Sequence, residues 1–363
     1  MNIFDYIIST KNEKLVELNT LDALIFTRLS YIHFEKITDK LPITINNLSN
    51  HLKDIHPSKL DKELIRLLKE SKRFRDITII RCRHISNSLQ EEEFTAITIL
   101  LPNKDKFISF RGTSKKLYDF KEDMNMSFKE VPSSIDALKY LKEETKYHKL
   151  YLGGHSKGGH LAMFAASHIN YFKALRINKI YNFDGPGFLE IDKSLKQIKN
   201  KIINYFPEGS IVGRIMLNPT PIIAIKTNKQ GIEAHNLYNW KVEDNALVVG
   251  KLSSKSNEFH NICLHLLEVI SKEKREMVIN YIFLLIQRGE IKSIKELKIT
   301  KIKAIINKSP HLLKEEKEEL LKFFKILIQC SIPKIINKKN LIKQKVKKSK
   351  IKSFKNKLTI VKR

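Results

Sequence analysis

One short segment of the sequence has the residue types and spacing that nucleophilic catalysis requires. Gly154–Gly158 reads Gly-His-Ser-Lys-Gly, and it lies between an apolar strand-like run and a helical run. A serine on so tight a strand-to-helix turn is strained, and larger side chains two residues away on either side would collide. We therefore predict that Ser156 is a nucleophile. A glycine-rich turn that only redirects the chain or binds phosphate is the alternative, but the dinucleotide and Walker patterns are absent from the sequence.

A serine hydroxyl is a weak nucleophile at neutral pH, so Ser156 requires a base within hydrogen-bond reach and an acid that holds this base in one tautomer. Where such a turn carries the nucleophile, the chain order is Ser, then Asp or Glu, then His. We predict that His235 is the base, because it lies in a loop after the last predicted core strands. His260 and His265, which flank Cys263 in a predicted helix, are the alternatives.

The elements that must position these residues alternate between strands and helices from about residue 94 onward. Capping residues and apolar periodicity predict one helix from Ser134 to about Tyr147 and another from Lys157 to about Ile169. Strands that alternate with helices indicate a mostly parallel sheet with helices on both faces. The predicted strands are Phe94–Leu101, Lys106–Phe110, Leu150–Gly153, Lys179–Phe183, Ile202–Phe206, Pro221–Lys226 and Ala246–Val249.

Both ends of the chain differ from this central region. Residues 1–90 read as helices that form either an ordinary packed subdomain or, over 44–71, a lid. Beyond residue 268 the strand pattern disappears and further helices are predicted. The residues predicted to cap helices at the two ends are Thr20, Thr44, Ser58, Ser271, Ser293 and Ser309. The predicted organisation is a domain over 1–268, a helical appendage over 269–331 and a basic tail over 332–363.

Composition limits the class of protein. A chain of 363 residues with 42% hydrophobic residues has enough apolar material for a core, which excludes global disorder. Its three cysteines lie far apart and form neither a disulfide framework nor a zinc pattern, which favours a reducing compartment. No cationic leader is seen, and no apolar run approaches the roughly 20 residues that cross a bilayer. We therefore expect a cytoplasmic protein without a metal or another cofactor.

The net charge of +28 is concentrated at the carboxyl end, where residues 271–363 contain 27 Lys and Arg against 8 Glu. Residues 334–363 contain 13 basic residues and no acidic one, which is typical of a solvated arm. Apolar residues among these lysines favour an anionic membrane surface as the partner of the tail. Nucleic acid is the less favoured partner, because interleaved aromatic residues that stack on bases are scarce there. The protein would then be cytoplasmic and peripheral to a membrane.

Three segments in a fixed order give the chain a family resemblance. Arg111-Gly112-Thr113, the stretch Phe120–Ser127 and the Gly154–Gly159 turn resemble class 3 (fungal-type) lipases and a related bacterial family of lipase-like α/β-hydrolases of unknown function. The likeness covers roughly residues 1–265 and says nothing about the basic carboxyl-terminal region. It implies an α/β-hydrolase fold, with a mostly parallel sheet and helices on both faces, to which the helical appendage is added. It also implies a histidine that is soon followed by tryptophan, as are His235 and Trp240.

The resemblance leaves two candidates for the acid. Asp184 follows a predicted strand in a turn that resembles the acid's site in pancreatic-type lipases. In class 3 lipases the acid follows the next strand, where this chain has Ser210 instead of the expected aspartate and offers Glu208 as a nearby substitute. We favour Asp184 over Glu208. A turn aspartate that only caps its own loop is the alternative for Asp184.

A tetrahedral intermediate also needs two preorganised donors for its oxyanion. One is expected to be the backbone N–H of Lys157, directly after the nucleophile. The resemblance places Thr113 as the second, with its hydroxyl as an assisting donor. Arg111 is expected to anchor the loop of Thr113 to a carboxylate such as Asp123.

Together these residues predict a serine hydrolase that cleaves acyl esters through an acyl-enzyme on Ser156, with a lipid or another apolar acyl chain as substrate. The pattern alone does not separate lipase, phospholipase, esterase, thioesterase or peptidase. A catalytically inactive hydrolase-like scaffold, whose basic tail binds a membrane surface or nucleic acid, is the alternative. The serine at position 210, where an acid is expected, favours that alternative.

Overall fold

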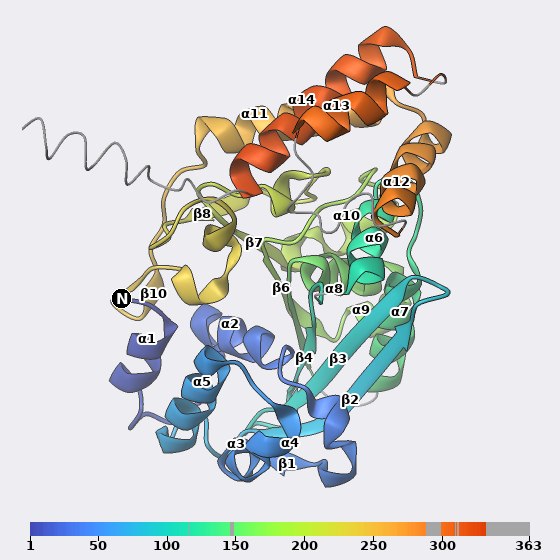
Figure 1. Cartoon of the computed structure of the whole chain (residues 1–363). Helices are drawn as coiled ribbons and strands as arrows, with labels where there is room; N and C mark the ends of the chain where they lie inside the picture. Colours follow the sequence, from blue (N-terminus) through green and yellow to red (C-terminus); the bar gives the residue numbers. More distant parts are fainter. Residues whose placement is uncertain (115, 146–148, 288–298, 309, 311, 332–363) are drawn as a thin grey trace, which may run out of the picture.

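The computed structural model describes residues 1–114, 116–145, 149–287, 299–308, 310 and 312–331. Eight strands form one sheet in which the spatial order follows the chain order (Figure 1). The first four strands pair antiparallel, and β4 to β8 pair parallel. The strands are β1 (Ile43–Thr44), β2 (Thr78–Asn87), β3 (Glu92–Leu100), β4 (Lys106–Phe110), β5 (Leu150–His155), β6 (Ile177–Phe183), β7 (Ile202–Pro207) and β8 (Ile222–Ile225).

Helices cover both faces of this sheet because successive side chains of a strand point to opposite faces. On β4, Phe107 packs into one apolar core and Ile108 into the other. The first core contains side chains of α1 (Ile3–Ser9), α2 (Thr20–Leu29), α3 (Ile45–Leu48), α4 (Leu52–Ile55) and α5 (Lys59–Glu70). The second contains side chains of α7 (Pro132–Glu144), α8 (Lys157–His168), α9 (Tyr171–Ala174) and α10 (Lys193–Ile198). The predicted fold class, a mostly parallel sheet with helices on both faces, is confirmed.

Two strand predictions were wrong. Residues 1–90 are not all helical, because β2 runs over Thr78–Asn87 and pairs with β3. Arginines of β2 gave it a polar pattern, and they bind Glu143 and Glu144 of α7. The predicted strand 246–249 is not a continuous strand of the main sheet, which it meets only through an isolated antiparallel bridge between Val249 and Ile225 of β8. Its first residues form β10 (Ala246–Leu247), which pairs with β9 (Val242–Glu243) through a two-residue turn in which both residues have positive φ, a hairpin geometry.

The carboxyl-terminal helices pack around a core of their own. They are α11 (Ser254–Val269), α12 (Lys272–Gln287), α13 (Ile299–Lys308) and α14 (Lys314–Ser331). This core also includes Phe120 and Met124 of α6 (Leu117–Asn125), so the appendage is anchored on the main domain. Figure 1 shows these helices at the end of the molecule opposite to α3, α4 and β1. The predicted caps at Ser293 and Ser309 and the predicted basic tail over 332–363 lie outside the described residues.

None of the described helices is both long enough and apolar enough to span a membrane.

Candidate active site

Ser156 lies on the turn between β5 and α8 and has φ 58° and ψ −134°, a backbone conformation that costs energy for a side-chain-bearing residue. The flanking glycines make this turn sterically possible. A Cβ on Gly154 would lie 2.0 Å from the carbonyl carbon of Gly158, and one on Gly158 would lie 2.0 Å from the carbonyl oxygen of Phe110. The turn therefore requires glycine at both positions, for the reason expected from the sequence.

Asp184 and His235 are brought together from distant parts of the chain. Asp184 follows β6, and His235 ends the 3₁₀-helix Gly231–His235. Nδ1 of His235 lies 2.6 Å from Oδ2 of Asp184, so the ring donates its Nδ1 proton to the carboxylate. The carboxylate is buried, and its Oδ1 also accepts from the hydroxyl of Ser210 and, at 3.2 Å, from the N–H of Gly213. Three donors therefore hold Asp184 in one orientation.

The other sequence-based candidates lie elsewhere. Oε1 of Glu208 accepts a hydrogen bond from the N–H of Lys251 at 3.2 Å. Nδ1 of His260 bonds the carbonyl of Arg214, and His265 is half exposed beside Glu268. Ser210, whose presence in place of an aspartate suggested a missing acid, donates to Asp184 instead. The geometry thus assembles Asp184 with His235 and leaves Glu208 outside the pair.

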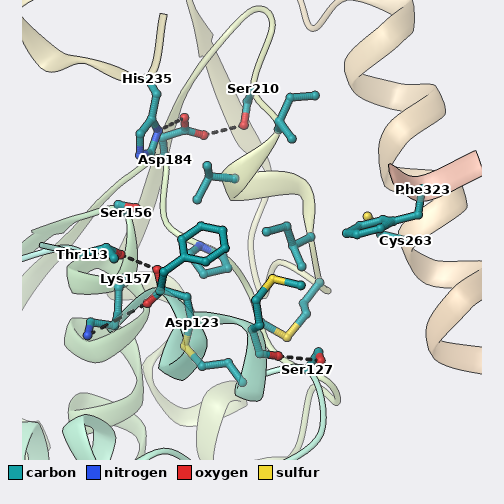
Figure 2. A pocket seen from close by; sticks show the side chains of 18 of the residues that line it. Thr113, Asp123, Ser127, Ser156, Lys157, Asp184, Ser210, His235, Cys263 and Phe323 are labelled. Atoms are coloured by element: carbon teal, nitrogen blue, oxygen red, sulfur yellow. Dashed lines mark hydrogen bonds and ion pairs between the residues drawn. The ribbon is translucent and has the colours of Figure 1, made fainter. Parts of the chain in front are cut away.

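Ser156 and His235 line the same cavity, and Figure 2 shows Ser156 between the Asp184–His235 pair and Thr113. With Nδ1 bonded to Asp184, Nε2 of His235 is the ring nitrogen left to accept a proton. Among the described residues, no hydrogen bond joins Ser156 to His235. Catalytic hydrogen bonds are often long in the free enzyme and tighten when substrate binds.

His155 connects the turn to the loop of His235. Its Nε2 lies 2.7 Å from the carbonyl oxygen of His235, which can only accept, so Nε2 carries the proton. Nδ1 then accepts from the hydroxyl of Tyr31 at 2.7 Å. Burial lowers the pKa of His155 well below its ordinary value, and burial raises the pKa of Tyr31 to about 12, so both groups are neutral at pH 7. These two hydrogen bonds could not be predicted from the sequence, because Tyr31 lies far from the turn along the chain.

We expect the Tyr31→Phe variant to lower kcat about fivefold, because one buried hydrogen bond contributes about 1 kcal/mol and its loss frees the ring of His155 to turn. Steady-state hydrolysis of a soluble acyl ester measures this effect. Tyr238→Phe is the matched control, since the hydroxyl of Tyr238 is also buried but donates to Asp61. That control should lose similar stability and keep its kcat. Equal kcat in both variants would contradict a positioning role for Tyr31.

The loop of Thr113 lies directly against the nucleophile. A Cβ on Gly112 would lie 3.0 Å from Cβ of Ser156 and 2.4 Å from the carbonyl oxygen of His155. Among the described residues, the backbone N–H groups of Thr113 and Lys157 have no protein acceptor. Two free donors therefore flank Ser156, as an oxyanion hole requires.

The hydroxyl of Thr113 bonds the carboxyl group of Asp123, whose other oxygen is shielded from solvent and has no hydrogen-bond partner. Burial raises the pKa of Asp123 to about 7, so neutral and ionised forms coexist near pH 7. While Asp123 is ionised, the Thr113 hydroxyl must donate to it. When Asp123 is protonated it can donate instead, which frees the hydroxyl proton of Thr113 for another acceptor.

The side chain of Lys157 has a role that the sequence did not predict. It is 1% exposed, and its Nζ pairs with Asp119 and with Glu122 of α6, the latter at 2.9 Å. These charges raise the pKa of Lys157 against the effect of burial, so it is a cation at neutral pH. Asp119 also accepts from the N–H of Ser114, next to Thr113. One buried ion cluster therefore ties the nucleophile turn to the loop of Thr113.

Arg111 was expected to pair with a carboxylate such as Asp123, but its ion pairs in the described structure are with other residues. It pairs with Glu93 at 3.3 Å and with Glu35 at 3.5 Å. The expectation that Arg111 anchors this loop to a carboxylate is therefore confirmed, with Glu93 and Glu35 as its partners. Asp123 was the wrong example, because its carboxyl group bonds the hydroxyl of Thr113 instead.

A cavity of about 630 Å³ opens at Ser156. One end contains the polar groups described above, including Thr113, Ser156, Asp184 and His235. The rest is lined mainly by apolar side chains of α6, of the segment 207–216 at and after the end of β7, and of the carboxyl-terminal helices. Residues 44–71, considered as a lid from the sequence, contribute no lining residue to this cavity in the structure. Among the described residues, no group of His, Cys, Asp and Glu is arranged to hold a metal ion.

The sheet, with a strand–turn–helix unit that presents Ser156 at the carboxyl end of β5, defines a protein of the lipase-like α/β-hydrolase fold. The chain belongs to the Mbeg1-like family, whose model matches residues 68–284. No curated protein matches the chain. It is similar to a solved structure described as the crystal structure of M37 lipase, with 16% identity over 55% of this chain and 70% of that one and a TM-score of 0.38.

Proposed function

We propose that this protein is a serine hydrolase that cleaves acyl esters. The observation that supports this most directly is the Asp184–His235 hydrogen bond of 2.6 Å beside a strained serine on a strand-to-helix turn. In this proposal Nε2 of His235 takes the proton of Ser156 Oγ as the hydroxyl attacks the ester carbonyl. The N–H groups of Thr113 and Lys157 bind the resulting oxyanion.

Collapse of this intermediate breaks the bond to the leaving alcohol, which receives the proton from His235, and leaves an acyl group on Ser156. Water then attacks the acyl-enzyme while His235 accepts its proton, and the released acid restores the serine. Asp184 accepts the Nδ1 proton throughout and so holds His235 in the tautomer that has a free Nε2. The alternative of an inactive scaffold rested on the lack of an acid at position 210, and the placement of Asp184 argues against it.

A fluorophosphonate probe tests this proposal, because it reacts with a serine only where a base and an oxyanion site activate it. We expect the intact protein to be labelled on Ser156, and we expect Ser156→Ala and His235→Ala to lose the label completely. Ser127→Ala is the matched control, because Ser127 lines the same cavity but donates to the carbonyl of Met124. A folded intact protein that takes up no label would exclude the proposed function.

A further inference from the structure

The cavity beside Ser156 has a polar end at the catalytic residues and an apolar end at the carboxyl-terminal helices. Its far wall is formed by apolar side chains of the carboxyl-terminal helices, among them Cys263 and Leu266 of α11, Val278 of α12 and Phe323 of α14. Figure 2 shows Phe323 and Cys263 together, across the cavity from Thr113 and Ser156. A cavity lined in this way holds water poorly, since water needs two to four polar partners. Its natural occupant is therefore apolar.

Arg275 is the charged side chain that these helices contribute to the lining. Its Nη1 donates to the carbonyl oxygens of Leu267 at 2.9 Å and of Ile270 at 2.5 Å, at the carboxyl end of α11. The guanidinium thus completes the end of a helix. Its Nε is shielded from solvent and has no hydrogen-bond partner. Apart from this one donor, a charged or sugar head group would find little compensation for its lost water at this wall. The acyl portion of an ester fits this end of the cavity, and its alcohol portion does not.

The wall is fixed to the catalytic region. Phe120 of α6 packs against Phe283 of α12 with ring centroids 6.2 Å apart, and α6 also contributes Asp119 and Glu122 to the ion cluster of Lys157. Helix α6 therefore contacts both the helices that line the far wall and the residues around the loop of Thr113. The matched family residues end at 284, so α14 and its Phe323 lie beyond them.

We propose that α11, α12 and α14 form the acyl-binding wall of the enzyme, and that its substrates are esters of long apolar acyl chains. This inference rests on the proposed hydrolase function. In this proposal the acyl chain of the substrate extends from the carbonyl carbon at Ser156 along α6, and its end lies between Cys263 and Phe323. Selectivity for chain length is then set by the appendage, part of which lies outside the family's matched residues.

The size of the expected effect follows from burial. A methylene that leaves water for an apolar wall contributes enough to raise kcat/KM about fourfold, as long as the cavity has room for it. The volume of about 630 Å³ lies within the roughly 300–1,000 Å³ typical of small-molecule sites. We therefore expect kcat/KM for p-nitrophenyl esters to rise steeply from acetate to dodecanoate.

Filling the far wall tests the inference. In Cys263→Phe a ring replaces the thiol in the cavity, so we expect the ratio of kcat/KM for the dodecanoate ester to kcat/KM for the acetate ester to fall about tenfold or more. Asn261→Phe is the matched control, because Asn261 is an exposed residue of the same helix. It should hydrolyse every ester as the intact protein does. A flat chain-length profile, or an equal loss for all esters in Cys263→Phe, would overturn the inference.

A second measurement covers the case in which Cys263→Phe fails to fold. The intact protein is treated with a dodecyl fluorophosphonate that has a diazirine at the end of its chain, irradiated and digested. We expect cross-links to peptides of α11, α12 or α14, and cross-links only to other segments would exclude this wall. Labelling of Ser156 without such cross-links refutes the inference alone, whereas a lack of any labelling refutes the hydrolase function itself.

Discussion

The Asp184→Asn variant is expected to lose about four orders of magnitude in kcat while its fold stays intact. An asparagine amide presents either N–H donors or an oxygen to His235. If it presents a donor, Nδ1 of His235 loses its proton and Nε2 gains one, so the ring can no longer act as the base for Ser156. If it presents its oxygen, the negative charge that stabilises the imidazolium in the transition state is lost.

The Asp184→Asn substitution is expected to change the chemistry of the site without disturbing the backbone around it. Asp184 has φ 53°, a left-handed conformation that asparagine adopts about as readily as aspartate, so the backbone is not strained by the change. With the amide nitrogen turned toward His235, the asparagine oxygen still accepts from the donors of Ser210 and Gly213. Thermal unfolding should therefore change little, and the loss should appear in kcat, with KM nearly unchanged.

Glu208→Gln is the matched control for the acid, because it removes the charge of the other sequence-based candidate. We expect its kcat to remain within about twofold of the intact protein, since surface changes away from a site usually alter free energies by less than about 0.5 kcal/mol. Near-normal turnover in Asp184→Asn together with a large loss in Glu208→Gln would transfer the role of acid to Glu208.

The parts of the site that could be predicted from the sequence are those that local sterics dictate. Only glycine fits at positions 154 and 158 around a strained serine, so the Ser156 turn is visible in a segment of five residues. The order of strands and helices likewise follows from local periodicity. Strand β2 was not predicted, because its polar side chains bind residues of α7. A partner so far along the chain cannot be recognised from the local pattern of residues.

What the sequence could not predict are the contacts between residues far apart in the chain. Asp184 and Glu208 both follow a strand end, and only the path of each turn brings one of them to His235. The relay from Tyr31 through His155 spans most of the amino-terminal half. The helices of the appendage could be predicted from their amphipathic pattern. That pattern is compatible both with helices that pack only on one another and with helices that line a cavity at Ser156, so it did not predict the second arrangement.

The Lys157→Met variant should lose about 3–5 kcal/mol of unfolding free energy, because it leaves buried carboxylates without a counter-charge. Asp119 and Glu122 are both shielded from solvent, and each bonds Nζ of Lys157. For a domain of this size such a loss corresponds to a fall of about 10 °C in the melting temperature. Lys139→Met is the matched control: its exposed pair with Asp136 should contribute less than about 1 kcal/mol.

The pH dependence of this loss separates a charge effect from a packing effect. In the intact protein the raised pKa of Lys157 keeps its contribution to stability complete below pH 10. In Lys157→Met the unpaired carboxylates bind protons more tightly in the folded than in the unfolded state, so the stability of the variant falls as pH rises. Chemical unfolding should therefore give a larger deficit at pH 8 than at pH 5. A deficit independent of pH would mean that Lys157 stabilises the turn through its packed alkyl chain, and Asp119 would then hold Ser114 without help from the lysine charge.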